Sequence, residues 1–406
     1  MRPADHDVVI AGGGLIGRIL AVALKRSAPG LDVVLLTGGR PTRAPTDDRA
    51  SAIAAAARRM FVRLDLWPSL SADAFPIERM RITDSALDDA VRPELLSFAG
   101  SVGPREPFAY MIPNAALADA ADAACEAADV RVRREAARVF DATADLVRVR
   151  LDTGETITAS LLVAADGAES RLRDIAGIGT VGRTYRQRGI VTTVRHSRAN
   201  DGTAIQHFLP SGPFAILPIG SHRASIVWSE EEHLAERLVA LDHFTFAVEL
   251  ERRFGPELGE VEVAGSRHAF PLRLRLARRY VADRFALAGD AAHVIHPLAG
   301  QGLNLGLRDV ATLAESVVGA HRLGLDPGGA DALDAYARLR RVDVAGLALV
   351  TDALNVLFSN DLDPVRMVRD MGLSIVERAG GLKRVFVREA AGLEGEVPLL
   401  MRGEAL

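Results

Sequence analysis

The sequence of 406 residues is long enough for two connected domains rather than one small core. Hydrophobic residues make up 49% and charged residues 25%, a balance that excludes a disordered or fibrous chain. The formal net charge of −4 excludes a global attraction to nucleic acid, and a single cysteine, Cys125, excludes an intramolecular disulfide and fits a reducing cytoplasm.

The first residues carry no secretory signal, because Arg2, Asp5 and Asp7 lead into an apolar run that enters a glycine turn. The most apolar late stretch, Val344 to Phe358, is too short to span a bilayer and contains Asp352. We therefore expect a cytoplasmic protein that touches a membrane, if at all, only peripherally at its inner face.

The chain begins with a predicted strand–helix–strand unit. Residues 8–10 form a short buried strand, 15–24 a helix and 33–36 a second strand. The glycines between the first strand and the helix, Gly12, Gly14 and Gly17, have the spacing GxGxxG. They permit a tight turn and let backbone N–H groups approach a pyrophosphate at the helix N-terminus. The motif predicts a bound dinucleotide but does not distinguish FAD from NAD.

The second strand of this unit lacks the acidic residue that usually binds the adenosine ribose. Thr37 and two glycines follow the strand instead. We expect Thr37 or the local backbone to hold that ribose.

The following segments change type along the chain. Helix periodicity runs over residues 48–67, short extended pieces over 75–98, and a helix begins at Leu117. Residues 189–267 alternate in polarity and are broken by Gly, Pro and Ser, which predicts an inserted β-rich region. Beyond Asp290 the chain becomes mainly helical, so the order of elements predicts interleaved domains.

Two later motifs add polar and small residues after predicted strands. In "LLVAADGAESRLR", Asp166 and Gly167 end an apolar strand, which alone indicates an ordinary turn. In residues 284–310, a strand delivers Asp290, and "HPLAGQGLNLG" precedes a helix. Asp290 can accept a hydrogen bond from a ribityl hydroxyl, and the amides of residues 300–302 can meet phosphate or the pyrimidine end of a flavin.

In this order and spacing, the three motifs resemble the class A flavoprotein monooxygenases with a para-hydroxybenzoate-hydroxylase-like fold. The segments "DDRASAIAAAARRMFVRLDLW", "GPFAILPIG", "HPLAGQGLNLGLRDV" and "TDALNVLF" resemble, more narrowly, the ubiquinone-biosynthesis hydroxylases of the UbiH/UbiF type. The resemblance covers nearly the whole chain.

The resemblance implies an α/β fold in which a Rossmann-like FAD-binding domain is interleaved with a β-rich substrate domain and followed by a C-terminal helical region. The FAD-binding domain would comprise residues 1–75, 100–182 and 280–340. The substrate domain would comprise 76–99 and 183–279, and the helical region 341–406.

The resemblance also implies where FAD would be held. Arg49 would lie over the pyrophosphate, Asp166 and Gly167 behind the flavin in a region that also serves NAD(P)H, and Asp290 at the ribityl chain. Glu169 stands where an asparagine is commoner in the family. The complete set of implied cofactor contacts is Gly12, Gly14, Gly17, Thr37, Arg49, Asp166, Gly167, Asp290, Pro297, Gly300, Gln301, Gly302 and Asn304.

Ring hydroxylation needs an electrophilic oxygen, which no side chain supplies, so the cofactor must carry it. The family uses flavin reduced by a transiently bound NAD(P)H and forms a C4a-hydroperoxide with O2. A histidine or tyrosine near the ring would remove the proton of a phenolic substrate. His207, Tyr185 and His296 are the candidates, although a packing role accounts for each of them better. The apolar residues of the inserted sheet would line a site for a polyprenylated phenol.

The late residues 366–388 interleave arginines and a lysine with apolar side chains. Such a segment can lie on an anionic bilayer, and a helix that caps the domain is an equal alternative. Partners in a quinone-biosynthesis complex are expected, whereas nucleic acid and metal ions are not. Three other functions stay open: a related monooxygenase or epoxidase on another substrate, a weakly active flavoprotein scaffold, and a nicotinamide dehydrogenase, which would explain only the first motif.

Overall fold

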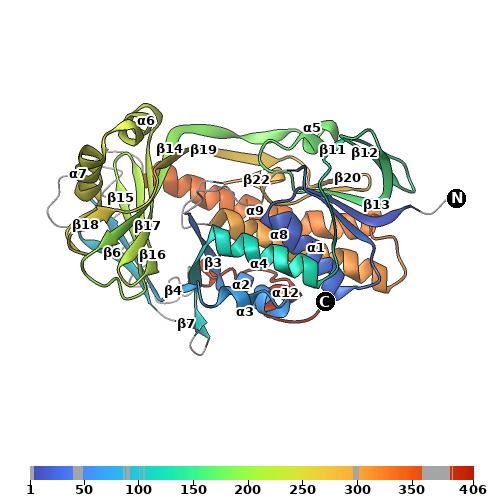
Figure 1. The fold of residues 1–406 in the computed structure, drawn as a ribbon, viewed down its shortest axis with the longest axis horizontal. Helices are drawn as coiled ribbons and strands as arrows, with labels where there is room; N and C mark the ends of the chain where they lie inside the picture. The colour runs from blue at the N-terminus through green and yellow to red at the C-terminus, as the bar shows by residue number, and fades with distance from the viewer. Residues whose placement is uncertain are drawn as a thin grey trace.

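The computed structural model describes residues 4–39, 49–85, 87, 92–99, 101–103, 106–295, 301–358, 385 and 387–406. Two large sheets lie at opposite ends of the molecule, and helices pack between and below them (Figure 1). This mixed α/β architecture confirms the predicted fold class.

The first sheet contains the predicted strand–helix–strand unit. Its main path runs through β10 (Arg131–Arg133), β2 (Val33–Leu36), β1 (His6–Ala11), β13 (Thr156–Ala164), β12 (Val147–Leu151) and β11 (Ala137–Ala142). Beside β13 lie β21 (Phe285–Leu287) and then β20 (Val281–Ala282). The strands β10, β2, β1, β13 and β21 are parallel, so their carboxyl ends meet at one edge, where open sheets of this kind bind ligands.

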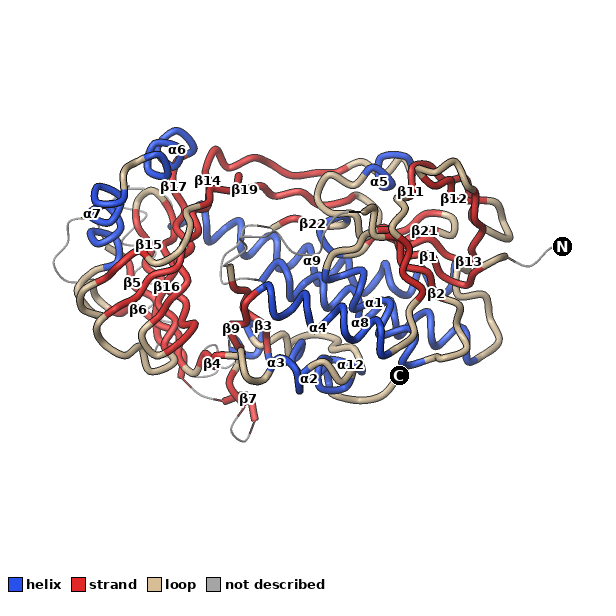
Figure 2. Tube along the Cα trace, in the orientation of Figure 1, coloured by secondary structure: helices blue, strands red, loops and turns tan. Residues whose placement is uncertain are grey.

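The second sheet is built mainly from the inserted β-rich region. Its main path runs through β22 (His293–Val294), β19 (His268–Ala277), β14 (Thr180–His196), β17 (Arg223–Glu231), β16 (Gly212–Gly220), β15 (Thr203–Leu209), β5 (Arg79–Asp84) and β6 (Glu94–Ala99), and β18 (Val261–Val263) pairs with β14. The long strands β14 and β19 reach from this sheet toward the first one (Figure 2). The helices α6 (Glu232–Ala240) and α7 (His243–Phe254) lie at its outer end. The domain boundaries that we expected stay a prediction.

A small third sheet corrects one local expectation. Residues 50–54 form strand β3 (Ala50–Ala54) and not the start of a helix. This strand pairs with β9 (Ala109–Pro113), which also pairs with β4 (Phe75–Ile77), and the pairing takes the backbone groups that a helix would need. The helix α2 (Ala55–Arg63) starts only after the strand and is followed by α3 (Trp67–Leu70); a two-stranded hairpin, β7 (Ser101–Gly103) and β8 (Glu106–Pro107), extends nearby.

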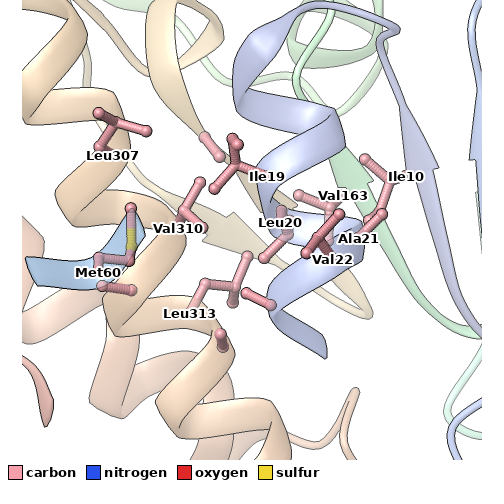
Figure 3. Packing of buried hydrophobic residues seen from close by; sticks show 14 of the residues in the cluster. Ile10, Ile19, Leu20, Ala21, Val22, Met60, Val163, Leu307, Val310 and Leu313 are labelled. Carbon is pink, nitrogen blue, oxygen red and sulfur yellow. The ribbon is translucent and has the colours of Figure 1, made fainter. Parts of the chain in front are cut away.

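The main core lies between the first sheet and a layer of helices. The helix α1 (Leu15–Ser27) packs against α4 (Asn114–Ala127) and α8 (Gln301–Arg322), and α8 packs against α9 (Ala330–Phe358). Figure 3 shows the contact between α1 and α8, with Ile19 and Leu20 facing Val310 and Leu313. These side chains are buried completely, so the burial of apolar surface fixes α8 beside the glycine turn.

The C-terminal residues fold back against this layer. The short helix α12 (Leu399–Arg402) contacts α2 and α8. Among the described residues, no helix combines the length and apolar character that a membrane span needs. Five of the basic residues that suggested a membrane-facing segment, Arg366, Arg369, Arg378, Lys383 and Arg384, lie outside the described residues, whereas Arg388 is described and contacts Glu394.

Candidate active site

The glycine turn after β1 has the geometry that its spacing predicts. A Cβ atom at Gly12 would lie 2.1 Å from the carbonyl oxygen of Ala165, and one at Gly17 would lie 2.0 Å from the carbonyl oxygen of Gly12. A Cβ atom at Gly14 would meet no atom within 4 Å. Gly14 is also the N-cap residue of α1, and no side chain caps this helix. The first turn of α1 therefore presents open amides to a ligand.

A cavity of about 980 Å³, which we call the first cavity, opens at this turn. Thr37 lies in its wall, and its hydroxyl donates to the carbonyl oxygen of Arg133 over 3.2 Å, so its oxygen can still accept a bond from a ribose hydroxyl. The polar and glycine residues of the wall are Gly12, Gly13, Gly14, Thr37, Gly38, Arg138, Asp152, Asp166, Gly167, Glu169 and Arg171. The first two sequence motifs thus meet in one cavity.

Glu169 connects this cavity to the long strand β19. Its carboxylate accepts hydrogen bonds from Arg273 over 3.0 Å and from Arg275 over 2.8 Å. The hydrogen bond from Arg275 is the largest cause of a pKa of Glu169 below its usual value. The carboxylate therefore connects the turn after β13 to the second sheet through both of its oxygen atoms.

A second cavity of about 560 Å³ lies between the helices and the second sheet. One wall is polar and is formed by Arg18, Arg49, Ser51, Asn114, Asp290 and His293. An apolar wall is formed by β14, β16, β17 and β19 of the second sheet, with Gly189, Val191, Ala215, Leu217, Val227, Phe270 and Leu272. The cavity therefore has the form of a small-molecule site, with an apolar lining and a few polar groups on one side.

Two arginines bring positive charge to the polar wall. The guanidinium of Arg49 lies 5.1 Å from the centroid of the Phe270 ring, which joins the start of β3 to β19. The buried Arg18 donates from Nε to Asp122, and its Nη1 has no hydrogen-bond partner. Both side chains lie near the N-terminus of α1, so they favour an anionic group there.

Asp290 projects into the second cavity from a short turn. It lies in the 3-10 turn η1 (Gly289–Ala291), and Gly289 before it has a φ of 62°. A Cβ atom at Gly289 would lie 3.1 Å from Ile16 of α1, which explains the glycine. The Asp290 side chain is open to the cavity, but the protein packed around it raises the pKa of its carboxyl, and His293 partly offsets this burial.

The buried carboxylate of Asp309 is hydrogen-bonded to this turn. Asp309 of α8 accepts hydrogen bonds from the amide of Gly289 over 2.8 Å and from Nε2 of His293 over 2.6 Å. It also accepts from Nε of Arg340 in α9 over 2.6 Å. The turn that carries Asp290 is thus bonded to two helices.

The remaining predicted cofactor contacts fall into three groups. Gly302 lines the second cavity, and Gln301 begins α8 beside it. Asn304 is buried, and its amide accepts from Ala54 and donates to Ala52, each over 2.8 Å. The cofactor contact expected of Asn304 stays a prediction, and its amide also holds β3, the strand that follows Arg49. Pro297 and Gly300 lie outside the described residues, as does the candidate base His296.

The other two candidates for a catalytic base do not line either cavity. His207 is buried in the second sheet, where its Nδ1 lies 2.5 Å from the hydroxyl of Thr83. Burial lowers the pKa of His207 to about 3. The ring of Tyr185 lies 4.9 Å from the guanidinium of Arg183 on the strand that bridges the sheets. Packing and local contacts account for both residues.

Sequence reasoning did not single out four residues of the polar wall. Ser51 donates to Asn114 over 2.7 Å, so these two form a pair beside Arg49. Arg18 directly follows the GxGxxG motif and His293 lies within residues 284–310, but the spacing of these motifs does not tell which side chains face a ligand. Only the packing of α1 and β22 places them at the cavity.

The two cavities adjoin at the start of α1, since Gly14 lines the first and Leu15 the second. A dinucleotide held at Gly14 would reach both cavities, with its adenosine beside Thr37 and its second base beside Asp290. The open space beside Gly14 leaves room for the pyrophosphate of such a molecule, and Nη1 of Arg18, which has no hydrogen-bond partner, could donate to it. A nicotinamide dehydrogenase would not explain why Asp290, Gly302 and the apolar wall line one cavity.

Comparisons with known proteins agree with this site. Residues 5–348 match the family described as FAD binding domain. The chain is 45% identical over 408 residues to the ubiquinone hydroxylase UbiL of Rhodospirillum rubrum, covering 98% of this chain and 93% of the relative. It is 34% identical over 402 residues to the 3-demethoxyubiquinol 3-hydroxylase of Escherichia coli, covering 97% of this chain and all of the relative.

A solved structure supports the fold independently. The p-nitrophenol 4-monooxygenase PnpA from Pseudomonas putida superposes with a TM-score of 0.77 at 20% identity. The match covers 98% of this chain and 100% of that protein. Because the identity is low, this likeness concerns the fold alone.

Proposed function

The chain belongs to the FAD binding domain family and is an FAD-dependent monooxygenase, and on this premise we propose that it hydroxylates the aromatic ring of a polyprenylated phenol in ubiquinone biosynthesis. The observation that carries the proposal is the second cavity, in which a polar wall with Asp290 faces an apolar sheet wall. Two relatives that match nearly the whole chain are named as hydroxylases of ubiquinone or of a ubiquinol precursor.

The residues present fit FAD, with each part of the cofactor matched to a different region. We propose that the α1 amides at Gly14, together with Arg18 and Arg49, hold the pyrophosphate. Thr37 would accept from the adenosine ribose, and Asp290 from the ribityl chain. Bound FAD supplies the chemistry that side chains lack, because it passes electrons from NAD(P)H to dioxygen and makes one oxygen atom electrophilic.

The chain's own residues would then orient the ring and exclude water. The wall formed by Val191, Ala215, Leu217 and Val227 offers no hydrogen-bonding side chain to the substrate. Apolar burial would therefore hold the ring and the first part of the prenyl chain, with the reacting carbon turned toward the polar wall. Water is disfavoured on the same surface, which protects the reactive oxygen from loss.

The test is oxygen incorporation by the purified full-length protein with FAD. Given NAD(P)H, labelled dioxygen and a detergent-dispersed prenylphenol, we expect a product that contains one labelled oxygen atom on the ring. A matched phenol without the prenyl chain should be a poorer substrate, because it buries less apolar surface. NAD(P)H oxidation that yields only hydrogen peroxide with every phenol tested would contradict the proposal.

We also propose that the protein works at the inner face of the cytoplasmic membrane, where a prenylated phenol resides. Val342 and Leu349, 73% and 71% exposed and seven residues apart on α9, support this contact, as do the five basic residues between 366 and 384. Full-length protein should float with vesicles that contain anionic lipid. Changing those five residues to Gln should reduce flotation, whereas Arg223→Gln, Arg237→Gln and Arg279→Gln together should not. Partners in a quinone-biosynthesis complex remain part of the proposal and would be sought by copurification.

A further inference from the structure

The carboxylate of Asp309 accepts hydrogen bonds from three separate elements. The donors are the amide of Gly289, His293 in β22 and Arg340 in α9. Two of these donors belong to the segment from Gly289 to His293, which carries Asp290 and which we call the cofactor turn. We propose that Asp309 is a positioning residue, which holds the turn from Gly289 to His293 in the geometry that binds FAD. The inference rests on the proposed contact between Asp290 and the ribityl chain.

The chemistry of the carboxylate suits this role. Burial opposes a charge on Asp309, but His293 and Arg340 outweigh it and hold the pKa of the carboxyl below its usual value. An ionised carboxylate only accepts hydrogen bonds, and here it faces three donors. Hydrogen bonds to a charged group are about twice as strong as those between neutral groups, so this contact is well suited to fix a turn.

The contact acts directly on the residues that face the cavity. Gly289 immediately precedes Asp290, so the bond from its amide to Asp309 fixes the peptide from which the Asp290 side chain emerges. His293 lines the second cavity, and its bond to Asp309 fixes the ring through Nε2, while Nδ1 has no partner. Gly306 of α8 adds a steric limit, because a Cβ atom there would lie 2.8 Å from Ile16 of α1. The turn therefore lies in a narrow space between α1 and α8, and its amide bond to Asp309 holds it there.

A role in general stability is the alternative to be separated from positioning. Arg284 and Asp326 form another arginine–carboxylate contact before the start of β21, with Nη2 and Oδ2 2.5 Å apart, although Asp326 is more exposed than Asp309. Neither of these residues lines the first or second cavity. Asp326→Asn thus removes a carboxylate from Arg284, which directly precedes β21, and leaves the contacts of the cofactor turn unchanged. It is therefore the control variant.

Neutralising Asp309 leaves its cationic partner with another carboxylate. Arg340 also donates from Nη1 to Asp343 over 2.7 Å. Tyr336 of α9 separately donates to the carbonyl oxygen of Leu287 over 2.7 Å, so α9 keeps a contact with β21. Asp309→Asn is therefore expected to fold. Oδ2 of Asp309 accepts from both Gly289 and His293, and Oδ1 accepts from Arg340. An NH2 group in the place of Oδ2 loses both bonds to the turn, because it cannot accept a hydrogen bond.

The experiment measures FAD affinity on full-length protein from which flavin has been removed. Fluorescence titration with FAD gives the dissociation constant, and thermal unfolding of the apoprotein gives its stability. We expect Asp309→Asn to raise the dissociation constant about tenfold, because a buried donor loses its acceptor. Asp326→Asn should leave the dissociation constant within about twofold of wild type, because Asp326 lines neither cavity. Its effect on apoprotein stability should be small, because the Asp326 side chain is 42% exposed and exposed ion pairs contribute little.

His293→Gln gives a second and milder test. It replaces the ring donor to Asp309 by the amide of a more flexible side chain, which holds the contact less firmly, and should raise the dissociation constant in the same direction by a few-fold. If Asp309→Asn does not fold, this variant decides the matter. An unchanged dissociation constant in a folded Asp309→Asn or, failing that, in His293→Gln overturns the inference. Failure of wild-type protein to bind FAD would instead overturn the cofactor assignment, so the two failures are distinguishable.

Discussion

A Cβ atom on Gly17 would lie 2.0 Å from the carbonyl oxygen of Gly12, so helix α1 can pack against the strand before it only if residue 17 is glycine. Gly14, between them, has open space where a Cβ atom would be. The same motif thus contains one glycine that folding requires and one that ligand approach requires.

Alanine substitutions should separate these two requirements. Gly17→Ala should destabilise the apoprotein by about 1–3 kcal/mol or more, because the new atom overpacks a backbone contact. Gly14→Ala should change apoprotein stability by no more than about 1 kcal/mol, the usual scale of an N-cap change, yet weaken FAD binding because the methyl group enters the first cavity. Denaturant unfolding and FAD titration measure the two effects. Equal loss of FAD affinity and equal loss of stability in both variants would contradict the distinction.

Asp290→Asn should improve the stability of the apoprotein at neutral pH and reduce its affinity for FAD. The protein packed around the cavity-facing Asp290 raises the pKa of its carboxyl above that of the unfolded chain, so its ionisation costs stability as pH rises through the folded-state pKa. The asparagine variant carries no charge at this position, and the stability difference should vanish in acid, below the usual pKa range of an aspartate. Thermal unfolding of both apoproteins across this pH range checks the sign. An apoprotein that is less stable than wild type at neutral pH and in acid alike would refute the account.

Val227→Phe should narrow the second cavity from its apolar wall. Val227 lies opposite Ala215 on neighbouring strands, and both line the cavity. We expect the KM for a prenylphenol to rise roughly tenfold or more through misfit, with flavin content unchanged. Val181→Phe is the control, since Val181 is exposed on the same sheet and does not line the cavity. A similar KM change in both variants would mean that the apolar wall does not contact substrate.

His207→Gln should make the protein less sensitive to acid. Burial lowers the pKa of His207 to about 3, below the value of 6.5 expected in the unfolded chain. The unfolded state therefore binds a proton first as pH falls, and wild-type protein should lose about 1.4 kcal/mol per pH unit from this group between those values. The variant should lack this slope, although losing the contact with Thr83 lowers its stability at neutral pH. An identical slope in both proteins would show that His207 is not buried in its neutral form.

The catalytic groups were harder to predict than the cofactor motifs. His207, which alternates with apolar residues in its strand, points into the second sheet toward Thr83, whereas His293 reaches the cavity wall. Both histidines lie in or beside short apolar runs, and nothing in their local pattern distinguishes them. Asn304 is similar, because its place in "GLNLG" did not predict that its amide bonds the backbone of β3.

Motif spacing by itself predicted a bound dinucleotide, the glycine turn, the strand–helix–strand unit and the presence of an inserted sheet, whereas FAD was implied by the family resemblance. Those properties depend on residues close together in the chain, where a tight turn or an alternating strand leaves a direct trace in the sequence. Tertiary structure alone decided that Arg18, Asn114 and His293 line one cavity, and that Asp309 accepts a hydrogen bond from the amide of Gly289, next to Asp290. Such contacts depend on how α1, α8 and α9 pack against the two sheets, and that packing follows from the burial of many apolar side chains rather than from any short motif.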